Sequence, residues 1–330
     1  MTAFYDARGN IYAVVTPEAL RAGGFDVPEQ ASQAALRRET WALAAVTACC
    51  GWTPGARPPG SKDHRCDGLL VGPFQAATPF DLLIVNTDGT LAERSGNGLT
   101  IFSQALSEQG LLPSAQTSVL RVHHDKRDAV SPVETSVKTA EVEGVSGFWL
   151  DLGKPLFGPQ AVGASGVEHV MCNGRETSHL PLLSALARAW NQSQFVRIGN
   201  PHCVTLLTDA DALPSNEQML EPGLFEGLMR IAYAPPSGAG RPCAAGVNLQ
   251  WAMLDAEGRI VARVFERGEG PTASSGTSAS AVACAAWRMG WVSAGAVSVV
   301  MPGGTAPILL EEELGELSRV RLFGTARLID

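Results

Sequence analysis

The sequence contains no block of lysine or arginine and no long apolar run. Its net charge of −8 is spread along the chain, which argues against nucleic acid as a partner. A membrane-spanning helix would need about 18 apolar residues in a row, and no stretch of that kind is present. The N-terminus also lacks a charged segment followed by an apolar one, as a secretion signal would have. We therefore expect a cytoplasmic protein that contacts neither nucleic acid nor membrane.

The cysteines show no spacing that is typical of a metal site. Their number is odd and their positions are irregular, so in a cytoplasmic chain we expect free thiols. The adjacent Cys49 and Cys50 lie in an apolar helical segment and are predicted to pack in a core. The seven positions are Cys49, Cys50, Cys66, Cys172, Cys203, Cys243 and Cys284.

Length and composition predict two globular domains. The chain has 330 residues, which exceeds the usual size of one domain, and 45% of them are hydrophobic. A break at Gly153-Lys-Pro places the boundary near residue 150. We assign residues 1–150, together with 324–330, to an N-terminal domain and residues 151–323 to a C-terminal domain.

Strand patterns dominate, and each half of the chain contains one long helical segment rich in small residues. Helices are predicted over 29–50, 96–110, 181–191 and 276–289, the first with Leu36, Thr40, Leu43, Val46 and Cys50 along one side. Strands are predicted over 67–72, 80–85, 118–152 in short runs, 167–172, 247–254 and 259–266. A Pro/Gly-rich loop is expected at 51–63. The two halves echo each other, which indicates an α+β fold built by internal duplication rather than a Rossmann alternation.

Two short stretches look like versions of each other. One runs from Asn86 to Gly98 (NTDGTLAERSGNG) and the other from Glu266 to Ser278 (ERGEGPTASSGTS). Each enters a predicted helix through Ser-Gly, where the first backbone N–H groups are unpaired and the helix dipole is positive. Serine before a helix also serves as an ordinary N-cap. Because the two turns match, we expect them to face one small-molecule site, with Gly96-Asn97 and Gly276-Thr277 binding an anionic group.

Five ordered motifs resemble those of the diaminopimelate epimerase family. The resemblance covers nearly the whole chain, apart from an insertion between residues 16 and 65. The motifs are Gly9-Asn10, Asn86-x-Asp-Gly-Thr with Ser95-Gly-Asn-Gly, Gly199-Asn-Pro-His-Cys, Glu266-Arg-Gly-Glu-Gly-x-Thr with Ser275-Gly-Thr, and Met301-Pro-Gly-Gly.

The resemblance implies two pseudo-symmetric domains, each a mostly antiparallel, β-barrel-like sheet wrapped around a central helix. It also implies isomerase chemistry in lysine biosynthesis without a cofactor or a metal ion, in which one residue removes the Cα proton and another protonates the opposite face. The small-molecule partner would be an amino acid, and a homodimer is compatible with the sequence. The implied substrate-binding residues are Asn10, Asn86, Gly96, Asn97, Asn200, Asn248, Glu266, Arg267, Gly276 and Thr277.

The chain departs from the family at the two proton carriers. Ser95 and Ser275 stand where the family has cysteines, and a serine hydroxyl is far less acidic than a thiol with its pKa of about 8.5. The family places His202 near the first position and Glu266 near the second, which suggests catalytic Ser95/His202 and Ser275/Glu266 pairs with His202 as a base. Gly68 and Ser278 also replace the usual Gln and Gly. A divergent homologue and a deliberately inactivated variant both fit these changes.

Three functions follow from this set of residues. The first is an epimerase that acts at the α-carbon of diaminopimelate or a similar amino acid. The second is a lyase or double-bond isomerase on a related amino or carboxylic acid, which needs only one base. The third is a binder that has kept the pocket and lost the chemistry.

Overall fold

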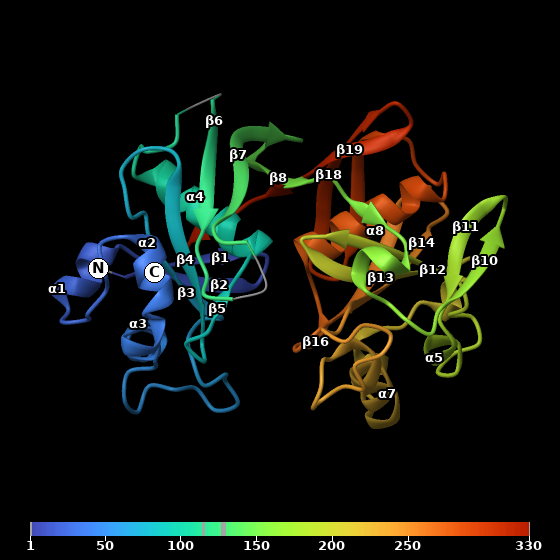
Figure 1. Ribbon diagram of the computed structural model, residues 1–330, viewed down its shortest axis with the longest axis horizontal. Coiled ribbons are helices and arrows are strands. Elements are labelled where there is room, and N and C mark those ends of the chain that lie inside the picture. The colour runs from blue at the N-terminus through green and yellow to red at the C-terminus, as the bar shows by residue number, and fades with distance from the viewer. Residues whose placement is uncertain (1, 114–115, 127–129, 330) are drawn as a thin grey trace. The chain divides into compact units, whose positions relative to one another are not determined.

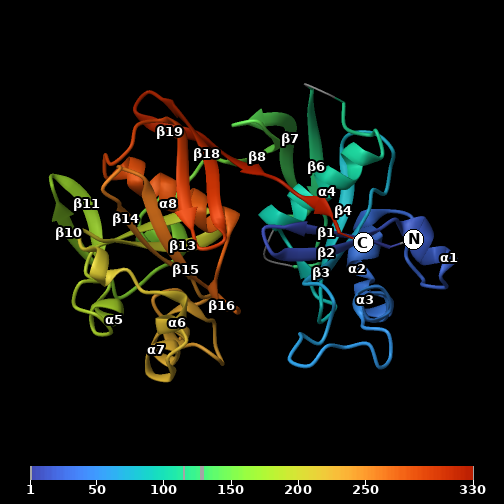
Figure 2. The same cartoon turned by 180° about the vertical axis from the view of Figure 1, so that it is seen from behind.

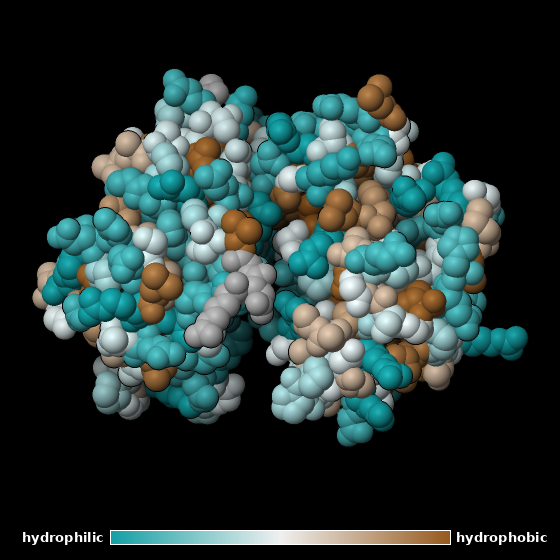
Figure 3. Space-filling view, viewed as in Figure 1, coloured by the Kyte–Doolittle hydropathy of each residue, from teal (hydrophilic) through white to brown (hydrophobic). Residues whose placement is uncertain are grey.

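The computed structural model describes residues 2–113, 116–126 and 130–329 and divides into two compact units (Figures 1 and 2). Unit 1 comprises Met1–Asp151 and Phe323–Asp330, and unit 2 comprises Leu152–Leu322. Both units combine strands with a few helices, so the α+β class expected from the sequence is confirmed. Within the described ranges, every helix is too short or too polar to cross a membrane. Hydrophilic residues cover most of the face shown in Figure 3, and small apolar patches interrupt them.

Unit 1 is a mixed sheet that packs against four helices. Its strands are β1 (Ala3–Ala7), β2 (Asn10–Val15), β3 (Gly68–Val71), β4 (Phe80–Asn86), β5 (Leu91–Ala92), β6 (Thr117–Val122), β7 (Val133–Val142), β8 (Val145–Gly153), whose last two residues belong to unit 2, and β20 (Arg327–Leu328). Parallel pairing joins β2 to β3 and β4 to β6, and the other pairs β20–β1, β1–β2, β3–β4, β4–β5, β6–β7 and β7–β8 are antiparallel. The helices are α1 (Pro17–Ala22), α2 (Ala31–Leu36), α3 (Ala42–Cys50) and α4 (Gly96–Glu108). Helix α4 packs against β1 and β2.

Unit 2 is a sheet wrapped around one buried helix, α8 (Gly276–Arg288). This helix contacts β12, β13, β14, β15, β17 and β18, and its residues 277–286 are all buried. The strands are β9 (Leu156–Phe157), β10 (Glu168–Cys172), β11 (Arg175–His179), β12 (Ser193–Ile198), β13 (Asn200–Leu206), β14 (Asn248–Leu254), β15 (Ile260–Glu266), β16 (Gly270–Thr272), β17 (Gly295–Met301), β18 (Gly304–Glu313) and β19 (Glu316–Gly324), the last ending in unit 1. The smaller helices are α5 (Pro181–Ser184), α6 (Asn216–Met219) and α7 (Pro222–Ala232).

The two units repeat the same series of elements around their long helices. In unit 1, β4 leads through a turn to β5 and then to α4, and in unit 2, β15 leads through a turn to β16 and then to α8. Each helix has 13 residues and begins after a serine N-cap. The side chains of α8 are almost all small, so six strands can pack closely around it. This repeat puts the two serines at equivalent points of the two units.

The helix predicted over 29–50 is wrong, because the structure breaks it into α2, a 3-10 turn at Arg38–Thr40, and α3. The indole of Trp41 is buried and donates to the carbonyl of Ala34 at 3.0 Å, which draws the chain inward at the break. Helix α3 then turns Ala42 and Ala45 to the core, whereas Leu43 is 58% exposed, as is Leu36 of α2 at 67%. Of the expected apolar side, only Val46 and Cys50 are buried.

The helix predicted over 181–191 is also wrong, since α5 ends at Ser184. Trp190 explains part of the difference. Its indole donates to the carbonyl of Ala212 at 2.9 Å, and its ring lies 4.9 Å from that of Trp251 in the core of unit 2. Because Trp190 is held in this position, the chain does not continue as a helix toward it.

Candidate active-site residues

Ser275 marks the start of α8 in unit 2. Its backbone is extended (φ −151°), and its Oγ accepts a hydrogen bond from the Ser278 N–H at 3.4 Å. The side chain is buried, with 6% exposure. As the N-cap, Ser275 lies next to the positive end of the helix dipole and the first N–H groups of Gly276 and Thr277.

Glu266 ends β15 and contacts this N-cap directly. Ser275 Oγ donates to Glu266 Oε1 at 2.5 Å, and Ser278 Oγ donates to the same oxygen over a longer distance of 3.5 Å. Burial raises the pKa of Glu266 from 4.5 to about 7, although both hydroxyl donors oppose the rise. A carboxyl group with a pKa near 7 is populated in both protonation states at neutral pH, as a general acid and base requires. The structure thus brings together the predicted Ser275/Glu266 pair.

His202 lies on β13, beside Asn248 of the parallel strand β14. Its side chain is fully buried, and its Nδ1 is 3.0 Å from Gln250 Nε2. Burial, with a smaller contribution from the positive charge of Arg267, lowers the pKa of His202 to about 3. The imidazole is therefore neutral at physiological pH. The predicted partner of His202, Ser95, belongs to unit 1, and their pairing stays a prediction.

Asn248 and Arg267 are linked through the backbone. Asn248 Oδ1 accepts from the Arg267 N–H at 2.8 Å, and Arg267 Nη1 donates to the carbonyl of Ala245 at 2.7 Å. Asn248 is buried and Arg267 is exposed, so the guanidinium is oriented by its neighbours and still open to an anion. Asn200 is half-buried at the first position of β13.

Ser95 occupies the equivalent N-cap position of α4 in unit 1. Its Oγ accepts from the Gly98 N–H at 3.0 Å and from the hydroxyl of Tyr12 at 3.4 Å. A Cβ at Gly98 would lie 3.1 Å from Ser95 Cβ, which explains the glycine two positions into the helix. The N–H groups of Gly96 and Asn97 are the first in α4, as those of Gly276 and Thr277 are in α8.

The two predicted asparagines of unit 1 are anchored by side-chain bonds. Asn10 Nδ2 donates to Asp67 Oδ2 at 2.8 Å, and Asn86 Nδ2 donates to Thr90 Oγ1 at 2.9 Å. Asn10 starts β2 and Asn86 ends β4, and both are half-buried. Their amide groups are therefore fixed before any ligand binds.

Several residues that bond to the predicted ones were not singled out from the sequence, and Asp67 is one of them. Tyr12 and Gln250 are two more. Each lies two positions after a predicted asparagine on the same strand, Asn10 and Asn248 respectively. Because side chains alternate along a strand, positions two apart share a face. This periodicity was the signal that could have identified both.

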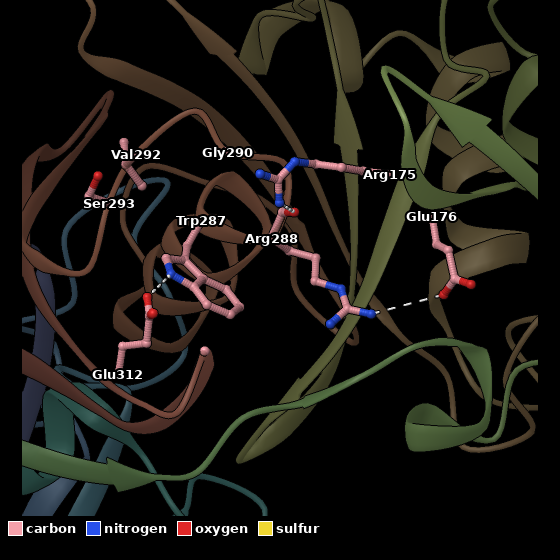
Figure 4. Close-up of a pocket in the computed structure, with 9 residues that line it drawn as sticks. Arg175, Glu176, Trp287, Arg288, Gly290, Val292, Ser293 and Glu312 are labelled. Carbon is pink, nitrogen blue, oxygen red and sulfur yellow. Dashed lines mark hydrogen bonds and ion pairs between the residues drawn. The ribbon is translucent and has the colours of Figure 1, made fainter.

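An open pocket of unit 2 lies at the other end of α8 (Figure 4). It has a volume of about 580 Å³ and is lined by Arg175, Glu176, Trp287, Arg288, Gly290, Val292, Ser293, Glu312 and Gly315. Trp287 donates to Glu312 at 2.8 Å, and Arg288 faces Glu176 at 4.0 Å. None of the residues predicted for the site is among its lining residues.

Comparison with known proteins identifies the family and the fold of the chain. A sequence model of diaminopimelate epimerase matches residues 194–328. The chain is 30% identical over 264 residues to diaminopimelate epimerase of Burkholderia vietnamiensis, and the matched region covers 79% of this chain and 80% of that one. It is 29% identical over 248 residues to diaminopimelate epimerase 2 of Nostoc sp., covering 75% of each. Among solved structures, a phenazine biosynthesis protein of the PhzF family from Bacillus anthracis shares the fold, with a TM-score of 0.58, 13% identity and coverage of 100% of this chain and 96% of that chain.

Proposed function

Because this chain belongs to the diaminopimelate epimerase family, we propose that it inverts the α-carbon of diaminopimelate or a similar amino acid. The chain is an isomerase. We assign the reaction to lysine biosynthesis in the cytoplasm, and we propose that it needs no cofactor. The contact between Ser275 and Glu266 carries this proposal.

Proton transfer in unit 2 can proceed through that contact. Ser275 Oγ takes the proton from Cα while its own proton passes to Glu266 Oε1, which lies 2.5 Å from Ser275 Oγ. The C–H bond breaks, an O–H bond forms on each of the two residues in turn, and the electron pair stays on the substrate as a carbanion. A glutamate with a pKa of about 7 accepts this proton more readily than an ordinary glutamate. The pair thus offsets part of the loss in acidity that serine brings relative to cysteine.

The N-terminus of α8 supports the carbanion. The N–H groups of Gly276 and Thr277 can hold the α-carboxylate, and charge that develops on its oxygens is stabilised by these donors and by the helix dipole. Ser95, with Gly96 and Asn97 at the start of α4, has the same local design, and we infer that it serves as the second proton carrier.

The remaining predicted residues suit the distal end of the substrate. Arg267 offers an oriented guanidinium for a carboxylate, and a bidentate pair of this kind is geometrically specific. Asn10, Asn86, Asn200 and Asn248 supply neutral polar groups. A substrate with an amino-acid group at each end, such as diaminopimelate, would use both sets.

The test is incubation with LL-diaminopimelate in D2O, followed by NMR at the α-position. Deuterium uptake with formation of the meso product is the expected result. Loss of a substituent would identify a lyase instead. A ligand-induced rise in melting temperature without any α-proton exchange would mean that the chain binds but does not isomerise, and would overturn the proposal.

A further inference from the structure

A chain of buried polar side chains connects His202 to Glu266 within unit 2. Gln250 and Ser278 lie between them, and these two side chains and His202 are fully buried, at 0% exposure. Gln250 Nε2 is 3.0 Å from His202 Nδ1 and 3.0 Å from Ser278 Oγ, and Ser278 Oγ is 3.5 Å from Glu266 Oε1. Neither Gln250 nor Ser278 has a place in the proton transfer described above.

The direction of each hydrogen bond follows from the chemistry of the groups. An amide nitrogen only donates, so Gln250 gives one N–H to His202 and the other to Ser278. Ser278 Oγ accepts from Gln250, which leaves its own proton for the carboxylate of Glu266. Because His202 Nδ1 accepts, the single proton of the neutral imidazole must be on Nε2.

The opposite orientation of the Gln250 amide is less favourable. It would place both N–H donors where Gln250 Oε1 is now buried without a partner. The flipped amide would leave two buried donors unsatisfied, whereas the present orientation leaves one donor, His202 Nε2–H, and one carbonyl oxygen unsatisfied. It would also turn the Ser278 proton toward Gln250 and away from Glu266.

The other ring nitrogen of His202 is itself unsatisfied. Nε2 is buried and makes no well-aligned hydrogen bond in the part of the chain that the structure describes, and the backbone acceptor near the ring is Ile198, which raises the pKa of His202 against the effect of burial. A buried N–H without an acceptor costs about 1–3 kcal/mol. A group of this kind calls for an explanation, and an acceptor oxygen on a ligand would satisfy it.

We propose that Gln250 is a positioning residue that holds His202 as a neutral hydrogen-bond donor, with its Nε2–H directed to an oxygen of the bound substrate. This inference rests on the proposed function and assigns His202 a different role from that of a base. A neutral imidazole can polarise a substrate oxygen on which negative charge develops, as in other enzymes that form enolates. Glu266 then moves the proton, and His202 stabilises the charge.

The burial of His202 agrees with this division of roles. Burial lowers the pKa of His202 to about 3, whereas it raises that of Glu266 to about 7. Two titratable groups whose surroundings shift their pKa values apart in this way have separate tasks.

The test is NMR of the protein with ¹⁵N-labelled histidine, in the wild type and in the variant Gln250→Met. Methionine fills similar space and adds no charge beside Glu266. The chain has six histidines, and loss of the His202 signals in a His202→Asn variant distinguishes them from those of the other histidines. Gln194→Met is the matched control, because Gln194 is also a buried glutamine of unit 2 and bonds to Glu176 and Met289 rather than to His202.

In the wild type we expect a neutral His202 with its proton on Nε2 across neutral pH. In Gln250→Met the proton should distribute over both ring nitrogens, and α-proton exchange should fall by about 100-fold, as for the loss of one charge-stabilising donor. The control should keep the wild-type tautomer.

A wild-type proton on Nδ1, a charged imidazole at neutral pH, or an unchanged tautomer in Gln250→Met would overturn the inference. If Gln250→Met fails to fold, Ser278→Ala removes the acceptor that orients the amide and should loosen the tautomer in the same direction. The tautomer of the wild type is decisive in any case. Wild-type protein without α-proton exchange would refute the proposed function but leave this measurement valid.

Discussion

Replacement of Glu266 by glutamine should change how stability depends on pH. The folded protein raises the pKa of Glu266 from 4.5 to about 7 because the carboxyl group is buried. Between these values the folded chain retains a proton that the unfolded chain releases. The contribution of Glu266 to the free energy of unfolding is therefore fully present below about pH 4.5 and is lost as the pH rises through about 7.

The size of the effect follows from the shift. Each pKa unit corresponds to about 1.4 kcal/mol, so the ionisation of Glu266 lowers the free energy of unfolding by roughly 3 kcal/mol. Glu266→Gln has no ionisation at this position and keeps an oxygen that accepts from Ser275. The free energy of unfolding of the variant, relative to that of the wild type, should thus be roughly 3 kcal/mol higher at mildly alkaline pH than at acidic pH.

Hydrogen exchange of the amides in α8 measures this difference, because it reports on unit 2 alone. Both proteins are compared at each pH, so the intrinsic pH dependence of exchange cancels. His202 acts in the opposite direction, since its pKa is lowered in the folded state and its contribution is lost as the pH falls. Both proteins contain His202, so this contribution also cancels. A difference in protection that stays constant across the pH range would refute the reasoning.

Three further predictions concern the two helix N-termini and Gly68 at the start of β3. Ser275→Ala should lower the free energy of unfolding by about 1 kcal/mol, because the N-cap of α8 is lost. It should also raise the pKa of Glu266 further, because a hydrogen-bond donor is removed, and the pH profile of amide hydrogen exchange in α8 should shift to higher pH. Gly68→Ala would place a methyl group 2.7 Å from a backbone oxygen. It should lower the free energy of unfolding, measured by thermal unfolding, by roughly 1–3 kcal/mol. Gly223→Ala is the control and should not destabilise the protein, because the space around Gly223 is open. Ser95→Cys combined with Ser275→Cys should increase α-proton exchange from diaminopimelate, because a thiol at a helix N-terminus ionises readily; no increase would mean a different substrate.

Local patterns predicted the parts of the fold that local forces determine. The Ser-Gly turns gave both N-caps, since an exposed set of N–H groups demands a capping side chain. The strands predicted over 80–85 and 259–266 are β4 and β15 in the structure, which end at Asn86 and Glu266.

Tertiary contacts determined the rest. The break in the helix predicted over 29–50 depends on Trp41 reaching the carbonyl of Ala34, which periodicity cannot show. The contact of Gln250 with His202 depends on the parallel register of β13 and β14, and a sequence does not state which strands are neighbours. The raised pKa of Glu266 likewise depends on burial by residues far along the chain.

The most direct test of the account is the pH profile of α-proton exchange from LL-diaminopimelate in D2O, measured for the wild type and Glu266→Gln. If Ser275 passes the proton to Glu266, exchange should rise as the pH passes about 7, where Glu266 loses its proton, and should be absent in the variant. Exchange that ignores pH in this range, or that persists at the wild-type rate in Glu266→Gln, would contradict the account.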